Sequence, residues 1–383
     1  MGSLEGIYLD HAATTPLHPS VLEAMLPYLS KVFGNPSSLH RFGREAKEAL
    51  TSARDSIAAR IGCSPSELVF TSGGTESDNL ALFGVAQAAG SARRRIVTTA
   101  IEHHAVLHAC REMERLGYEV VYVGVDHTGV VKWDELSEAI DDRTALVSVM
   151  YGNNEVGTLQ PIEDIGRMAR ERGAFFHIDA VQALGHAHID LGRLPVDAMS
   201  FSAHKINGPK GIGALYVNKR VKLAPRSFGG SQERKRRAGT ENVAGAVGFA
   251  KAAELALADV PRRCAELLEL RQAMIDGLKE RLPEGALVVN GHPNEHLPHV
   301  LNVSFPGANS ESLLMNFDLG GVAASSGSAC SAGALEPSHV LQAMELPDPL
   351  LRSAVRFSFG YGNCLKTVTI AAEIVATIVK RFS

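Results

Sequence analysis

The feature that most restricts the fold of this chain is the alternation of short apolar runs with amphipathic segments between residues 65 and 217. The amphipathic segments 134–142 and 162–173 have a helical spacing of apolar residues. The apolar runs have the length of buried strands; they are 95–100, 119–125, 144–151, 174–180, 197–203 and 213–217. Strands alternating with helices predict an α/β fold, a mainly parallel sheet covered by helices on both faces.

The pattern changes after a long helical span at 239–260. Shorter apolar runs follow at 286–291, 299–306 and 355–360, separated by a segment rich in Ser, Gly and Ala. At 383 residues the chain is longer than a usual single core. We therefore expect a large domain at 15–258 and a smaller α+β domain made of 1–14 and 259–383.

Composition excludes several classes of protein. The net charge of −4 does not favour a nucleic-acid or membrane-surface partner, and no apolar run approaches the roughly 20 residues that span a bilayer. The five cysteines (Cys63, Cys110, Cys264, Cys330 and Cys364) are scattered and form no CxxC pair, so neither a metal site nor a disulfide framework is expected. With no secretory pattern at the start, we expect a cytoplasmic protein.

In this type of sheet, ligands bind where strands end. The strand-like residues 68–70 lead into Ser-Gly-Gly-Thr and an amphipathic run, so Gly74 and Thr75 lie at a predicted helix N-terminus, which favours an anion such as phosphate. An ordinary glycine turn with Thr75 as the helix cap explains the pattern equally well.

Two further strand ends carry ionisable groups. Asp179 ends one apolar run, with Gln182 three residues later; the carboxylate is either a helix cap or the partner of a cationic ring nitrogen. Ser202, His204 and Lys205 end another, and a desolvated lysine is a nucleophile suited to Schiff-base formation. A phosphate cradle, a ring-nitrogen carboxylate and a reactive lysine together predict pyridoxal 5′-phosphate (PLP) as the cofactor.

These motifs resemble those of the cysteine desulfurases, specifically the NifS/IscS-type (group I) branch of the class V aminotransferase family. The resemblance covers nearly the whole chain, from 8–16 and 33–38 to 324–340 and 355–360, and the sequence SSGSAC at 325–330 is typical of this branch. It implies the PLP-dependent transferase fold of type I, with a seven-stranded, mainly parallel sheet in the large domain and a smaller α+β domain.

The resemblance also implies roles in binding the cofactor. Lys205 would form the Schiff base, Asp179 would pair with the ring nitrogen, and Gln182 would donate to the ring oxygen. His103 would stack on the ring and move protons, while His104 would be a bystander. The remaining cofactor-binding positions are Gly74, Thr75, Asn154, Ser202 and His204, with Thr240 supplied by the other subunit of a homodimer.

For the substrate, L-cysteine, the resemblance implies binding by Arg356, Asn154 and Asn35. Cys330 would take the sulfur as a persulfide and leave L-alanine, and the small residues around it predict a mobile loop at about 322–335 that reaches into the pocket and swings out. A buried structural role is the alternative for this cysteine.

The sulfur acceptor expected from the resemblance is an iron–sulfur scaffold protein or the assembly of another thio-cofactor, although the docking tail of some relatives is not expected after the final residues ATIVKRFS. Two other functions remain open at this point. One is selenocysteine lyase or another class V PLP enzyme, and the other is a non-catalytic sulfur carrier or scaffold that keeps the fold.

Overall fold

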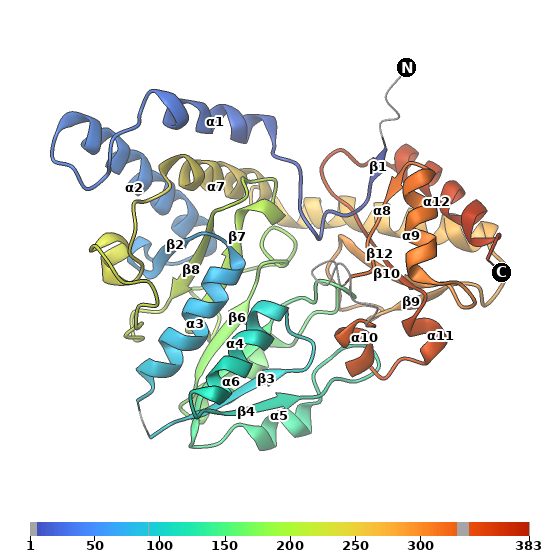
Figure 1. Ribbon diagram of the computed structural model, residues 1–383, viewed down its shortest axis with the longest axis horizontal. Helices are drawn as coiled ribbons and strands as arrows, with labels where there is room; N and C mark the ends of the chain where they lie inside the picture. Colours follow the sequence, from blue (N-terminus) through green and yellow to red (C-terminus); the bar gives the residue numbers. More distant parts are fainter. Residues whose placement is uncertain (1–5, 91, 328–336, 383) are drawn as a thin grey trace.

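A seven-stranded sheet forms the centre of the protein in the computed structural model, which describes residues 6–90, 92–327 and 337–382 (Figure 1). Its strand order is β2-β8-β7-β6-β5-β3-β4, and only the two pairings of β8 are antiparallel. The strands are β2 (Leu68–Thr71), β3 (Arg95–Thr99), β4 (Glu119–Val123), β5 (Thr144–Met150), β6 (Phe175–Asp179), β7 (Ala198–Ser202) and β8 (Gly213–Val217). Each predicted run from 95 to 217 is a strand to within two residues, which confirms the α/β fold.

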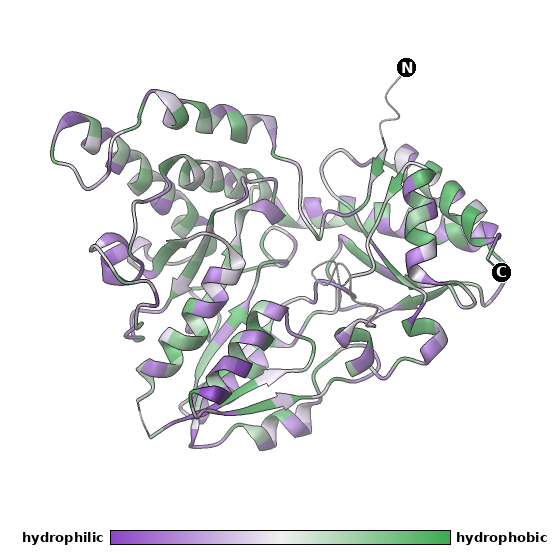
Figure 2. Cartoon of the chain, viewed as in Figure 1, coloured by the Kyte–Doolittle hydropathy of each residue, from purple (hydrophilic) through white to green (hydrophobic). Residues whose placement is uncertain are grey.

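Helices cover both faces of this sheet, and an apolar core lies on each side of it. One core joins the sheet to α2, α5, α6 and α7, and the other joins it to α3 and α4. Figure 2 shows the central strands mostly hydrophobic and the covering helices of mixed hydropathy. The helices of this part are α1 (Pro19–Ser30), α2 (Arg41–Ile61), α3 (Gly74–Ala88), α4 (His104–Arg115), α5 (Trp133–Ala139), α6 (Ile162–Glu171) and α7 (Val243–Ala256), with 3₁₀ turns η1 (Pro65–Glu67), η2 (Ala203–Lys205) and η3 (Gln232–Lys235).

A second body packs a three-stranded antiparallel sheet, of order β12-β10-β9, against helices α8, α9 and α12 (Figure 1). Its own apolar core includes Leu9 from the start of the chain. Its elements are β1 (Ile7–Tyr8), α8 (Val260–Arg281), β9 (Val288–Asn290), β10 (Val300–Ser304), α9 (Ser310–Leu319), β11 (Val322–Ala323), α10 (His339–Ala343), α11 (Asp348–Leu351), β12 (Ala354–Ser358) and α12 (Leu365–Val379). The domain boundaries at 14/15 and 258/259 remain a proposal.

The N-terminal segment after β1 connects the two bodies. Asp10 pairs with Ser358 of β12, and Thr15 donates from both its N–H and its hydroxyl to the carbonyl oxygen of His204. This segment therefore places the ends of β6 and β7 opposite β12. In the part of the chain that the structure describes, no helix has the length and apolar character to cross a membrane.

Candidate functional site

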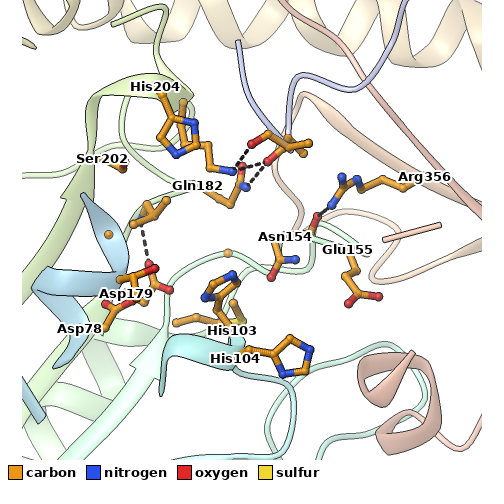
Figure 3. Close-up of a pocket in the computed structure, with 18 of the residues that line it drawn as sticks. Asp78, His103, His104, Asn154, Glu155, Asp179, Gln182, Ser202, His204 and Arg356 are labelled. Atoms are coloured by element: carbon orange, nitrogen blue, oxygen red, sulfur yellow. Dashed lines mark hydrogen bonds between the residues drawn. The ribbon is translucent and has the colours of Figure 1, made fainter. Parts of the chain in front are cut away.

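A cavity of about 310 Å³ opens at the carboxyl ends of the central strands, and Figure 3 shows its polar lining. The ends of β6 and β7, the N-termini of α3 and α4, and Arg356 of β12 all contribute to it. Its volume suits a small organic ligand. The predicted site residues that line it are Gly74, Thr75, His103, Asn154, Asp179, Gln182, Ser202, His204, Lys205 and Arg356.

One end of the cavity has the features of an anion site. Helix α3 begins at Gly74, and Gly73 in the N-cap position gives its first N–H groups no side-chain partner. The hydroxyl of Ser202 is buried and has no hydrogen-bond partner among the described residues. A Cβ atom on Gly74 would lie 2.7 Å from Val181 Cγ2, so this close approach requires glycine. A phosphate group is the ligand that such free donors favour.

Thr75 lies within the first turn of α3 and is not its cap, because the helix starts two residues earlier than the capping interpretation requires. His204, on the other side of the anion site, contacts Thr14 Oγ1 through Nδ1 at 3.1 Å. Burial, with the charges of Lys205 and Lys210, lowers the pKa of His204 to about 4. This imidazole is therefore neutral at pH 7.

Lys205 and Gln182 meet at the main chain of the N-terminal segment. Lys205 Nζ donates to the carbonyl oxygens of Ala12 and Ala13, at 2.6 and 2.8 Å. Gln182 Nε2 also donates to the Ala12 oxygen, at 2.8 Å. These contacts hold the amine of Lys205, at the end of η2, in the lining of the cavity.

Asp179 ends β6 and belongs to a buried polar cluster with Asp78 and His177, which the sequence pattern did not reveal. Burial raises the pKa of Asp179 to about 6, against a lowering by the Val181 N–H and Lys205. Burial and the charge of Asp179 raise the pKa of Asp78 well above its usual value. His177 fills the space between strands, bonded to Ser148 Oγ and Ser200 Oγ at 2.9 Å each, and burial lowers its pKa to about 3. The imidazole inside the apolar run FFHID was the available signal.

His103 occupies the N-cap of α4, where its Nδ1 accepts from the Ala105 N–H at 3.1 Å. Burial, followed by the charge of Lys205, lowers the pKa of His103 to about 4. The ring is thus neutral, with its proton on Nε2. His104 also lines the cavity, but its ring lies against His108 and His339, with centroids 5.1 and 4.8 Å away.

Arg356 is the cation at the far side of the cavity. It is almost fully buried, and donates to the Asn154 carbonyl at 2.8 Å and to Asp10 at 2.9 Å. Its Nε–H has no partner among the described residues, so the guanidinium keeps a donor for a carboxylate ligand. Glu155, also missed in the sequence, lines the same wall; burial raises its pKa, and it accepts a short hydrogen bond from Ser338.

Three predicted site residues are not placed in the cavity. Asn35 is exposed and accepts from the Ser37 N–H, and Thr240 is exposed in the segment after η3. Cys330 lies outside the described residues. The start of the predicted loop is paired: 322–323 form β11, and Ser325 exchanges main-chain hydrogen bonds with Arg356. The predicted mobile loop at about 322–335 is therefore paired at its first residues, and its mobility stays a prediction.

Comparison with known proteins identifies the family. The family model described as aminotransferase class V matches residues 7–370. The chain is 52% identical over 382 residues to the putative cysteine desulfurase IscS 1 of Bacillus subtilis (strain 168), covering 99% of this chain and 100% of that protein. It is 48% identical over 377 residues to the cysteine desulfurase IscS of Methanosarcina thermophila, covering 98% and 93%. A solved NifS-like protein matches 98% of this chain and 100% of its own, with a TM-score of 0.92 and 37% identity.

The chain therefore belongs to the class V aminotransferases, a family of PLP-dependent enzymes. Within that class it belongs to the cysteine desulfurases of the IscS and NifS type, as the sequence motifs predicted.

The residues in the cavity fit PLP. The donors at the start of α3 and the unpartnered Ser202 hydroxyl suit its phosphate, and Lys205 suits its aldehyde. The buried Asp179 carboxyl has a raised pKa, so a cationic ring nitrogen is the partner that would return it to its ionised form. When bound, the cofactor draws electrons from the α-carbon of the substrate.

Proposed function

We propose that this chain is a cysteine desulfurase that converts L-cysteine to L-alanine and transfers the sulfur to Cys330. The observation that supports this most directly is that Lys205, Asp179 and Arg356 line one cavity although they come from three separate elements, the turn η2, the end of β6 and the middle of β12. A lysine, an acid for a ring nitrogen and a cation for a carboxylate are what a PLP site for an α-amino acid needs.

The chain's own residues then have defined tasks. Arg356 binds the substrate carboxylate through its free Nε–H, beside Asn154. Lys205 removes the α-proton, since its amine faces the same cavity. His103 is neutral with its proton on Nε2, so it can donate a hydrogen bond to a group that gains negative charge within the cavity.

In the sulfur transfer, one bond to the substrate sulfur forms while another breaks. The Cys330 thiolate attacks the substrate sulfur, so an S–S bond forms on Cys330 while the C–S bond of the substrate breaks. The electron pair of the broken bond stays with carbon, which takes up a proton and becomes the methyl group of alanine. Only the thiolate is a competent nucleophile, so Cys330 must be deprotonated at the moment of attack.

The test is to supply L-cysteine to the PLP-loaded protein, to measure alanine, and to locate the added sulfur by mass spectrometry. We expect one extra sulfur on Cys330 and loss of alanine formation in Cys330→Ser. Cys364→Ser is the matched control, because Cys364 is exposed at the start of α12 and outside the cavity. Persulfide on Cys364, or full alanine formation by Cys330→Ser, would refute the assignment.

Selenocysteine is the competing substrate, because release of its selenium depends less on attack by a nucleophile such as the Cys330 thiolate. We propose that L-cysteine is preferred. The kcat/KM values of the intact enzyme for the two amino acids decide the matter, and a much larger value for selenocysteine would reverse the assignment.

The proposal extends to the surroundings of the enzyme. We propose a cytoplasmic homodimer in which Thr240, and also Asn35, act at the site of the neighbouring subunit, which agrees with their exposure in a single chain. We further propose that the persulfide supplies iron–sulfur cluster or thio-cofactor assembly through a scaffold protein.

A further inference from the structure

Two buried imidazoles lie next to Gln182 and have no task in the reaction described so far. The rings of His186 and His299 stack, with centroids 3.7 Å apart and an interplanar angle of 22°. Only 5% of His186 and 1% of His299 is exposed, and neither lines the cavity. Each contacts a different part of Gln182, which does line it.

The partners of His186 fix its protonation. Its Nδ1 lies 3.1 Å from the main-chain oxygen of Gln182, which can only accept, so Nδ1 carries the proton. Its Nε2 lies 3.4 Å from Arg263 Nη2, which can only donate. His186 is therefore a neutral ring that fixes the main chain at Gln182. Burial, followed by the charge of Arg263, lowers its pKa and agrees with this state.

The side chain of Gln182 fixes the proton of His299 in the same way. The Gln182 NH₂ group faces the Ala12 carbonyl at 2.8 Å, so the amide oxygen is on the opposite side, 3.2 Å from His299 Nε2. His299 must then donate through Nε2. Its Nδ1 carries no proton, and this buried atom has no partner among the described residues.

We propose that His299 is a positioning residue for the cofactor, because it holds the Gln182 amide with its second N–H turned toward the cavity. This rests on the proposed function, in which that N–H donates to the ring oxygen of PLP. Without the His299 donor, the Gln182 amide oxygen would be a buried acceptor with no partner, which is costly, and the amide would lose the contact that fixes its orientation. A half-turn of the amide would not relieve this cost, because it would place the amide oxygen against the Ala12 carbonyl oxygen.

Two substitutions test the N–H donor of His299 separately from the stacking of its ring. His299→Phe keeps the stacking on His186 and loses the N–H, whereas His299→Asn keeps an N–H donor and loses the stacking. His296→Phe is the control, because it makes the same change three residues away, where the imidazole contacts the Leu297 carbonyl instead. The ionisable groups around position 299, His11, His186, Lys205 and Arg263, stay the same in all variants.

The measurements are the pH titration of the visible absorption of the PLP-loaded protein and the dissociation constant of PLP from equilibrium dialysis. Negative charge on the ring oxygen stabilises the proton held at Lys205 Nζ, and a hydrogen bond from Gln182 withdraws part of that charge. Loss of the bond should raise the titration midpoint by about one pH unit in His299→Phe. It should also weaken PLP binding by about tenfold, while His299→Asn stays close to the wild type.

The inference is overturned if His299→Phe titrates like the wild type, or if His296→Phe shifts as far. Should His299→Phe fail to fold, His299→Leu removes the same donor with less bulk. In addition, Gln182→Leu should give the same shift, and adding the His299 change to it should give no more. A wild type that forms no coloured link to Lys205 would refute the proposed function itself, so the two failures are distinguishable.

Discussion

At the scale of single residues, the site is made of groups whose protonation is set by burial. Asp179, His103 and His204 all have pKa values moved toward the neutral form, and each move is led by loss of contact with water. A ligand that brings a positive ring nitrogen and a negative phosphate supplies the charged partners that would return such groups toward their ionised forms. The shifted pKa values of these residues therefore favour binding of a charged cofactor over filling of the cavity by water.

Asp179 gives a pH test of this view. Its pKa is about 6 in the folded protein and about 3.9 in an unfolded chain. Since the folded pKa is higher, the group stabilises the cofactor-free protein fully below about pH 4, and this contribution is lost as the pH rises through 6. Asp179→Asn should therefore stabilise the cofactor-free protein more at pH 8 than at pH 5, by at most about 3 kcal/mol, while it weakens PLP binding.

Thermal unfolding at the two pH values measures the effect. Asp276→Asn, on the exposed side of α8, is the control for the loss of a carboxylate outside the cavity. An Asp179→Asn variant whose advantage is equal at pH 5 and pH 8 would contradict the assignment.

At the scale of elements, the turn η3 holds backbone strain. Glu233, Arg234 and Lys235 have φ values of 43°, 56° and 65°, a left-handed run that costs non-glycine residues roughly 1–2 kcal/mol each. The buried Glu233 carboxylate accepts two hydrogen bonds from Arg54, at 2.6 and 2.8 Å, and one from the Phe70 N–H. This ion pair offsets the strain and fixes the segment that leads to Thr240.

We therefore expect Glu233→Gln to lower the free energy of unfolding by about 3 kcal/mol, because it leaves the buried Arg54 charge without its partner. Urea unfolding measures the change. The control is Glu45→Gln, which removes an exposed ion pair with Arg41 and should cost less than about 1 kcal/mol. Equal losses in the two variants would show that η3 needs no such anchor.

Elements were more predictable from the sequence than contacts between them. Apolar periodicity located the central strands, because burial on both faces of a sheet requires continuous apolar runs. It did not reveal Asp78 or His299, because each looks like an ordinary polar residue until the fold brings it to Asp179 or Gln182. The capping interpretation of Thr75 failed because Gly73 can take the cap position without a side chain.

At the scale of the whole molecule, the proposed dimer makes each site depend on two chains. If Thr240 acts on the neighbouring subunit, Lys205→Ala and Thr240→Ala chains should complement each other. One of the two sites in a mixed dimer would then have both an intact Lys205 and an intact Thr240. We expect co-expressed chains to regain alanine formation that each variant lacks when expressed alone.

Light scattering of the purified protein measures the mass, and the mixed dimers are isolated with two different affinity tags. Mixed dimers no more active than the better of the two single-variant proteins would mean that Thr240 serves its own chain. Each site would then be complete within one chain, and the dimer would not be required for activity on this ground.

The N-terminal segment has a consequence for biosynthesis. Ala12 holds Lys205 across 193 positions of sequence, and Asp10 holds Arg356 across 346. Contacts of such long range form late in folding. A ribosome must therefore release almost the entire polypeptide before the segment around Asp10 and Ala12 can pack in its final position. A nascent chain stalled before β12 would lack Arg356, the residue proposed to bind the carboxylate of the amino acid.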